Sequence, residues 1–271
     1  MMPTLSNRNS ISINTLCLPD ADLADHACTV ARLGVTGISP TLEQVSDFST
    51  AASAIIFRDA GLTVATLTHR SFGFATAEEA EVARDRLQRS IDIAHCISAC
   101  SITFTTGGRG DLTWPEAASR FAEAIAPCAE LARAAGIKLS LEPTSHLYAE
   151  ISIAHRLADT IELVRAADIH LGIDLFACWF DSDIAEAIAD GAGEAALVQV
   201  SDYAPGDRAL PCRVVPGDGM AQLGRLIPQI HAAGFRGFYD IEIFGARVAA
   251  EGEEAALARA VAKLEQFIPL E

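Results

Sequence analysis

Basic and aromatic residues are scarce in this sequence, and long apolar runs are missing from it. Its 20 Lys and Arg residues stand against 36 Asp and Glu residues, which gives a net charge of −16. A protein of this net charge repels nucleic-acid phosphates, and the sequence has no run of basic residues that could follow a nucleic-acid backbone. We therefore expect no nucleic-acid partner. The apolar runs are the length of strands, well short of the roughly 20 residues that a membrane-spanning helix needs, so we expect no membrane partner.

Targeting and disulfide signals are also missing. The N-terminal segment MMPTLSNRNS has no basic stretch followed by an apolar one, so we expect a cytoplasmic protein. The cysteines are odd in number and form no CxxC pair, which favours reduced thiols over a disulfide framework. They are Cys17, Cys28, Cys96, Cys100, Cys128, Cys178 and Cys212. Cys96 and Cys100 stand close in the chain, but two thiols are too few for a soft-metal site.

The sequence does contain a regular alternation of short β-rich runs and longer amphipathic segments. This alternation is typical of repeated βα units around a parallel sheet. The predicted strands are Ser10 to Thr15, Gly34 to Ser39, Leu62 to Thr68, Ser101 to Thr106, Ile137 to Glu142, His170 to Leu175, Leu197 to Asp202 and Phe238 to Ile243. Eight consecutive units favour closure, so we predict an α/β fold with a single (β/α)8 TIM barrel. No linker divides the chain, and residues 1–271 are expected to form one domain.

Capping residues mark the boundaries of several expected helices. The predicted starts are Pro19-Asp20, Thr76 with Glu79, and Thr113 with Trp114 and Pro115. The glycines expected to end helices in a left-handed conformation are Gly34, Gly61, Gly136 and Gly234. The segment NTLCLPD after the first strand lacks the glycine-rich fingerprint of a dinucleotide-binding fold, which also favours the barrel.

Polar oxygen donors stand near the C-terminal ends of the last four predicted strands, where core strands are otherwise apolar. They are Glu142, Asp174, Gln199 and Glu242. A barrel brings these strand ends to one mouth, where barrel enzymes place their chemistry. Three carboxylates crowded together repel one another unless a cation lies between them. The sequence therefore predicts a divalent-metal site formed by these four side chains.

The ligand set indicates which metals suit the site. Oxygen donors favour hard divalent cations, and we expect Mn²⁺ first, with Mg²⁺, Co²⁺ and Zn²⁺ as alternatives. For any single acid the alternative is a helix cap or an ion pair with an arginine, the ordinary role of a lone carboxylate. Four such residues on successive strands favour the metal site, because burying unpaired charge repeatedly is costly.

Five motifs carry a resemblance to a known family. They are LSLEP (139–143), LGIDLFACWFD (171–181), VQVSDY (198–203), RVVPGDG (213–219) and GFRGFYDIEIF (234–244). The chain resembles the sugar phosphate isomerase/epimerase family of xylose isomerase-like TIM barrels over nearly its whole length. Relatives include ketose 3-epimerases, inosose dehydratase and 3-dehydroshikimate dehydratase. The family's metal ligands map by motif onto Glu142, Asp174, Gln199 and Glu242.

The resemblance also implies catalytic roles. Glu142 and Glu242 are expected to transfer protons on opposite faces of the substrate, while the metal polarises a carbonyl and stabilises the resulting enediolate. Two positions depart from the family pattern. Gln199 stands where histidine is commoner in the family. Its amide still offers an oxygen ligand, and some dehydratase relatives are similar at this position. Ala177 stands where many relatives complete an Asp-x-x-His motif, so no imidazole is supplied there.

Four further residues are candidates for substrate contact. They are His69, Arg70, His146 and Arg213. The first three follow predicted strands and are expected near the mouth, with an ordinary loop position as the alternative. Arg213 precedes the turn VPGDG and could bind a substrate hydroxyl, carboxylate or phosphate, or pair instead with Asp218.

These observations lead to one function and two alternatives. We expect a divalent-metal-dependent isomerase or epimerase that acts on a small polyhydroxylated ketone, such as a keto-sugar, by proton transfer through a metal-stabilised enediolate. The first alternative is a metal-dependent lyase, a dehydratase of the inosose or 3-dehydroshikimate type. The second is a non-catalytic or partner-dependent barrel subunit, which the missing histidine at Ala177 favours. Relatives are often dimers or tetramers, so a homo-oligomer stays open.

Overall fold

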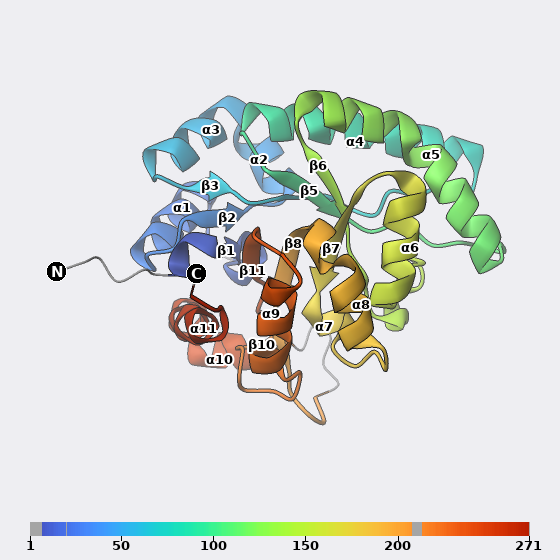
Figure 1. The fold of residues 1–271 in the computed structure, drawn as a ribbon. Helices are drawn as coiled ribbons and strands as arrows, with labels where there is room; N and C mark the ends of the chain where they lie inside the picture. Colours follow the sequence, from blue (N-terminus) through green and yellow to red (C-terminus); the bar gives the residue numbers. More distant parts are fainter. Residues whose placement is uncertain (1–6, 20, 208–212, 271) are drawn as a thin grey trace.

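Nine parallel strand segments form one curled sheet surrounded by helices in the computed structural model (Figure 1). The structure describes residues 7–19, 21–207 and 213–270. The parallel strands are β1 (Ile11–Asn14), β2 (Gly37–Ser39), β3 (Thr63–Val64), β4 (Leu67–Thr68), β5 (Ser101–Phe104), β6 (Lys138–Leu141), β7 (His170–Asp174), β8 (Ala195–Val200) and β11 (Phe238–Ile241). They are hydrogen-bonded in the order β3-β2-β1-β11-β8-β7-β6-β5-β4, which confirms the predicted barrel.

The segment that contains β3 and β4 completes the barrel, because it pairs with β2 on one side and with β5 on the other. We predicted a continuous strand from Leu62 to Thr68, and the structure divides it into β3, which pairs with β2, and β4, which pairs with β5. Backbone hydrogen bonds continue through the break, from Ala65 N to Ile38 O at 2.9 Å and from Cys100 N to Val64 O at 2.9 Å. The two ends of the strand order are therefore halves of the same strand, and the sheet is nearly closed.

Helices cover the outside of the sheet (Figure 1). They are α1 (Leu23–Arg32), α2 (Leu42–Phe48), α3 (Thr50–Asp59), α4 (Ala77–Cys96), α5 (Trp114–Ala135), α6 (Leu157–Ala167), α7 (Leu175–Cys178), α8 (Ile184–Gly191), α9 (Leu223–Ala232), α10 (Ala246–Glu251) and α11 (Glu253–Phe267). Among the described residues, no helix is long and apolar enough to cross a membrane. The cysteines described by the structure are free thiols, and Cys212 lies outside the described residues.

The predicted helix boundaries are mostly confirmed. Glu79 N donates to Thr76 Oγ1 at 3.1 Å, and Thr113 N donates to Glu116 Oε2 at 2.9 Å. The four glycines at helix ends have φ between 70° and 102°, the left-handed region. The predicted first start is wrong: Asp20 lies outside the described residues, and α1 is capped by Asp22, whose Oδ1 accepts from Asp25 N at 2.9 Å.

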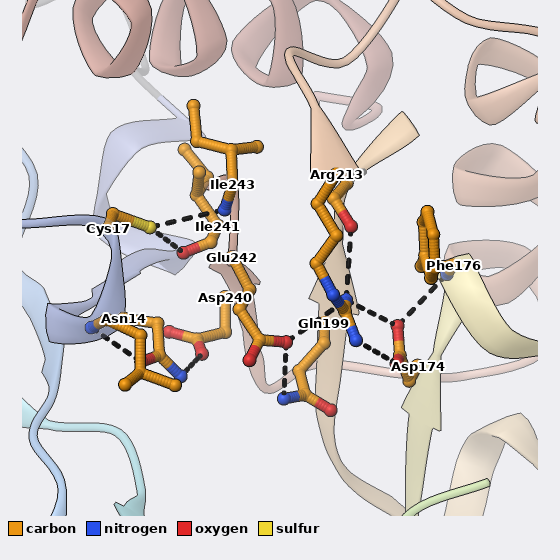
Figure 2. A network of polar contacts seen from close by, with 12 residues as sticks. Asn14, Cys17, Asp174, Phe176, Gln199, Arg213, Asp240, Ile241, Glu242 and Ile243 are labelled. Atoms are coloured by element: carbon orange, nitrogen blue, oxygen red, sulfur yellow. Dashed lines mark hydrogen bonds and ion pairs between the residues drawn. The ribbon is translucent and has the colours of Figure 1, made fainter. Parts of the chain in front are cut away.

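A polar cluster inside the barrel joins the two ends of the chain. Because β1 lies between β2 and β11, N-terminal and C-terminal strands are neighbours (Figure 1). Asp240 Oδ1 accepts from the hydroxyls of Ser12 and Ser39, both at 2.6 Å. Its Oδ2 accepts from Asn14 Nδ2 at 3.2 Å (Figure 2). Burial raises the pKa of Asp240 to about 6, although these three hydrogen bonds lower it. Glu242 follows β11 two positions later, and its Oε2 accepts from Gln199 Nε2, so it also points into the barrel, farther toward the mouth.

Close contact between strands leaves no room for a larger side chain at Gly37. A Cβ there would lie 2.5 Å from Ser12 Cβ and 2.8 Å from Ile11 O. We therefore expect Gly37→Ala to lower the free energy of unfolding by about 1–3 kcal/mol, since β1 and β2 must separate. Urea unfolding measures this change. An unaltered midpoint would show that the two strands can move apart at no cost.

The loop between β8 and α9 carries a second, small sheet at the mouth. Its strands β9 (Asp202–Tyr203) and β10 (Arg213–Val214) pair antiparallel. Asp202 organises this loop, because its carboxylate accepts from the backbone N of Tyr203, Gly217 and Ala221 at 2.8–2.9 Å. Those hydrogen bonds explain why the motifs VQVSDY and RVVPGDG lie together in space. They also place Arg213 over the end of β8.

Candidate active site

The four oxygen donors predicted from the sequence converge at the mouth of the barrel. Glu142 follows β6, Asp174 ends β7, Gln199 lies in β8 and Glu242 follows β11. Asp174 and Gln199 are partners in the strand register, and the residues Asp174, Gln199 and Glu242 are only 2%, 3% and 7% exposed. The cluster is therefore held by four adjacent strands and largely shielded from water.

The hydrogen bonds of the cluster leave two buried acceptors without a donor. Gln199 Nε2 donates to Glu242 Oε2 at 3.0 Å. Glu142 Oε2 and Gln199 Oε1 are buried and have no hydrogen-bond partner. Buried acceptors are normally satisfied, so such atoms at one place indicate that a donor or a cation belongs there.

Arg213 lies at the centre of this cluster (Figure 2). Its Nη2 is 2.7 Å from Asp174 Oδ2, and its Nη1 is 3.2 Å from Asp174 Oδ1, so the guanidinium binds that carboxylate with both arms. Nη1 also lies 3.1 Å from Glu242 Oε2 and donates to Ser201 Oγ at 3.1 Å. The expected site and the expected substrate-binding arginine thus form one network. Asp218, the alternative partner of Arg213, pairs instead with Arg259.

Two phenylalanines that we did not predict as site residues flank the guanidinium. Arg213 Cζ lies 4.6 Å from the ring centroid of Phe176 and 5.7 Å from that of Phe244. Such cation–π contacts fix the plane of a guanidinium without using its hydrogen-bond donors. Both residues lie within the motifs quoted above, two positions after Asp174 and Glu242 respectively. That spacing is the only sequence signal that could have identified them.

Crowding of carboxylates in a dry environment controls their protonation. Burial raises the pKa of Glu142 well above its ordinary value, and the charges of Glu242 and Asp174 raise it further. Burial raises the pKa of Glu242 to about 7, while Arg213 opposes the shift. Burial alone would lower the pKa of Arg213, but Asp174 and Glu242 outweigh it and raise that pKa. The guanidinium stays charged, and Glu242 can exchange a proton near neutrality, while Glu142 holds its proton to a higher pH than an ordinary glutamate does.

The donor set fits a divalent cation, as judged from the unsatisfied oxygens. Carboxylate and amide oxygens are the ligands of hard cations, and the two buried acceptors, Glu142 Oε2 and Gln199 Oε1, belong to that set. A cation would also relieve the repulsion that raises the pKa of Glu142. Among the described residues, no three His, Cys, Asp or Glu side chains already converge as ligands of a single ion. The guanidinium of Arg213 instead separates Asp174 from Glu242.

The shifted pKa of Glu242 predicts how stability depends on pH. We expect the free energy of unfolding of the metal-stripped protein to rise as pH falls from about 8 to about 6.5. Glu242 takes up its proton near pH 7 in the folded chain, but near its ordinary value of 4.5 when unfolded, so protonation favours the folded state. Thermal unfolding in a chelator measures this, and Glu242→Gln should flatten the slope. A stability that decreases across this window would contradict the assignment.

A cavity of about 220 Å³ opens beside the cluster. Its walls include Glu142, Asp174 and Arg213, together with hydroxyl-bearing side chains from the loop after β6, namely Thr144, Ser145 and Tyr148. His146 belongs to the same loop, but its side chain is exposed and is not part of the cavity wall. The hydroxyls and carboxylates facing this space suit a small polyhydroxylated molecule.

The other two predicted contact residues lie away from the cluster. The backbone of His69 follows β4, but its Nδ1 lies 2.9 Å from Ser90 Oγ on α4, so the ring lies in the helix layer. Burial, reinforced by Arg86, lowers the pKa of His69 to about 4. Arg70 is exposed and pairs with Glu43. Neither His69 nor Arg70 is part of the cavity wall beside Glu142.

The comparison with known families agrees with this geometry. Residues 29–267 match the xylose isomerase-like TIM barrel family, and the chain belongs to that family. The comparison with curated proteins finds no match.

Solved structures show the same fold. Protein SMc04130 from Sinorhizobium meliloti 1021 is 26% identical, with a TM-score of 0.88 over 97% of this chain and 100% of that one. The IolI protein, solved with a binding zinc atom, is 14% identical, with a TM-score of 0.85 over 96% of this chain and 98% of that one. An L-ribulose 3-epimerase is 18% identical, with a TM-score of 0.81 over 96% of this chain and 94% of that one.

Proposed function

We propose that this protein is a divalent-metal-dependent isomerase or epimerase of a small polyhydroxylated ketone, acting by proton transfer through an enediolate. The observation that carries the proposal is the pair Glu142 and Glu242. Both are carboxyl groups of raised pKa at the barrel mouth, Glu242 buried and Glu142 half-buried, beside unsatisfied oxygen acceptors. The L-ribulose 3-epimerase fold and the zinc atom of IolI support the same class of chemistry.

The residues that would hold the cation are Glu142, Asp174, Gln199 and Glu242. Mn²⁺ is our first choice, with Mg²⁺, Co²⁺ and Zn²⁺ as alternatives, because these are oxygen ligands. A divalent cation bound there would supply the positive charge that makes a C–H next to a carbonyl acidic.

The chain's own groups would then move the proton. In the metal-free chain the pKa of Glu242 is about 7, and its carboxylate would accept a proton from the substrate and return it. Glu142 is the second group that would accept and return a proton. Its Oε2 has no hydrogen-bond partner, so this oxygen is free to take up a proton from the substrate. The rings of Phe176 and Phe244 lie beside this polar centre and line the cavity, where they would limit the access of water once a substrate fills it. Proton exchange with solvent is thereby slowed while the substrate is bound.

Elemental analysis of the purified protein tests the metal site. Wild type and Glu142→Ala are dialysed against metal-free buffer and then loaded with Mn²⁺. We expect about one ion per chain in wild type and none retained by the variant, because the ligand set is incomplete. Glu162→Ala, on the exposed face of α6, is the matched control and should bind as wild type does. A wild-type protein that retains no metal under either condition would remove the proposed mechanism.

A dehydratase is the second candidate, favoured by Gln199. An amide at this position is an oxygen ligand that does not titrate, whereas the histidine usual in the family does. The same base could remove a proton and a β-hydroxyl could then leave. Mass spectrometry of products from ketoses, inososes and dehydroshikimate separates the two reactions, since only the dehydratase lowers the mass by one water.

A further inference from the structure

Arg213 occupies the acceptor atoms that a metal would need. Both oxygens of Asp174 and Oε2 of Glu242 lie within 3.2 Å of its guanidinium. Asp174 Oδ1 also accepts from Phe176 N at 3.0 Å. Every Asp174 oxygen therefore already has a donor, in contrast with the unsatisfied Glu142 Oε2 and Gln199 Oε1.

We propose that Arg213 is an internal cation that competes with the divalent metal for Asp174 and Glu242, and so sets the affinity and exchange rate of the metal. The inference rests on the proposed function, because it requires the metal site. A metal that binds Asp174 must weaken at least one of the two hydrogen bonds between the guanidinium and that carboxylate. The free energy of that rearrangement is subtracted from metal binding.

The charge of Arg213 and the geometry of its contact with Asp174 have different consequences for metal binding. Three carboxylates and one guanidinium leave two uncompensated negative charges when all are ionised (3 − 1 = 2), which a divalent cation would neutralise. Net charge alone therefore allows the metal and Arg213 to coexist in the cluster. The two-armed contact with Asp174 is what makes them compete, because both oxygens of one carboxylate are engaged. A lysine at this position would keep the charge and remove the two-armed contact.

The surroundings of Arg213 allow the guanidinium to move. It begins the two-residue strand β10, and its side chain, 15% exposed, lines the 220 Å³ cavity. Phe176 and Phe244 line the same cavity, and their ring faces attract a cation that lies over them. A guanidinium displaced from Asp174 by a metal would therefore have the cavity to enter, beside the same two rings.

Mn²⁺ titration of three variants of the metal-stripped full-length chain tests the competition. They are Arg213→Lys, Arg213→Met and Arg259→Met. We expect Arg213→Lys and Arg213→Met to bind Mn²⁺ about tenfold more tightly than wild type, because the two-armed contact is lost. Arg259 also bridges two carboxylates, Asp218 and Glu251, but outside the cluster, so Arg259→Met should bind as wild type does. Calorimetry gives the affinities and stopped-flow mixing gives the association rates, which should rise with them.

The outcomes separate this inference from the proposed function. If neither wild type nor any variant binds Mn²⁺, the metal site itself is wrong. If wild type binds and Arg213→Lys binds equally or more weakly, the competition for Asp174 is overturned; weaker binding would mean that the two-armed contact orients Asp174 for the metal. Arg213→Met could also bind Mn²⁺ tightly while Arg213→Lys keeps wild-type affinity. The change in affinity would then come from charge alone, which also overturns the competition through the two-armed contact. Should Arg213→Met not fold, the lysine variant alone decides.

Discussion

Glu142→Gln and Glu242→Gln are each expected to lower kcat by about a thousandfold or more while the fold is retained. Glutamine keeps the size and one carbonyl oxygen of glutamate but cannot accept a proton, and general acid–base catalysis contributes about 10²–10⁴ to a rate. Glu242 has a pKa near 7, suited to proton exchange at neutral pH, and the pKa of Glu142 is also raised by burial and by its acidic neighbours. Each substitution therefore removes a carboxyl group whose pKa is raised.

Three measurements make that result interpretable. The metal content of each variant separates loss of a ligand from loss of proton transfer, because a variant that still binds Mn²⁺ has lost only the second. Circular dichroism and thermal unfolding show whether the fold is intact. Glu162→Gln, an exposed substitution on α6, serves as the control for handling and should be fully active. Full activity in either site variant would refute the assignment of that glutamate.

The positions of the site strands were predictable because their pattern is local. Glu142, Asp174 and Glu242 each interrupt an apolar run where a strand ends, and parallel strands in a barrel end at the same mouth. Nothing beyond strand order was needed to bring them together. The same reasoning failed to divide the strand from Leu62 to Thr68, because the transfer of its pairing from β2 to β5 depends on how the sheet closes.

The contacts of Arg213 were not predictable, because they depend on the shape of a long loop. Arg213 is separated from Asp174 by 39 positions in the chain and reaches it through the loop that Asp202 organises. Its place in the motif indicated a position near the mouth, but not that two rings would hold its guanidinium between two carboxylates. Sequence patterns specify which face of a strand is apolar; they do not specify how loops from different strands interlock.

His69 illustrates the limit at the level of a single residue. Its position after β4 was predicted, and its backbone N does pair with Thr103 O at 2.8 Å. The ring nevertheless contacts Ser90 on α4, because neighbouring residues of a strand point to opposite sides and a shift of one position reverses the direction. Period-two alternation is regular within a strand, but it gives no reliable direction for the first residue beyond the strand's end.

The second large effect is expected at Asp174, where the structure links stability to the site. Asp174→Ala removes the two-armed partner of a buried guanidinium and the acceptor of Phe176 N. Breaking one side of a buried ion pair costs about 3–5 kcal/mol, since the remaining charge has lost its partner. Glu242 stays 3.1 Å from Arg213, so we expect a loss of about 3 kcal/mol in the free energy of unfolding, the lower end of that range.

A double variant tests whether that loss comes from the unpaired guanidinium. Urea unfolding of the metal-stripped protein compares Asp174→Ala, Arg213→Met and the two combined. If the unpaired guanidinium is the cause, the combined variant loses less than the sum of the single losses, because it contains no guanidinium that could lose its partner. Asp218→Ala, which breaks a half-exposed ion pair with Arg259, is the matched control and should cost less than about 1 kcal/mol. Strictly additive losses would mean that Asp174 stabilises the chain mainly through Phe176 N, and that Arg213 is not held by it.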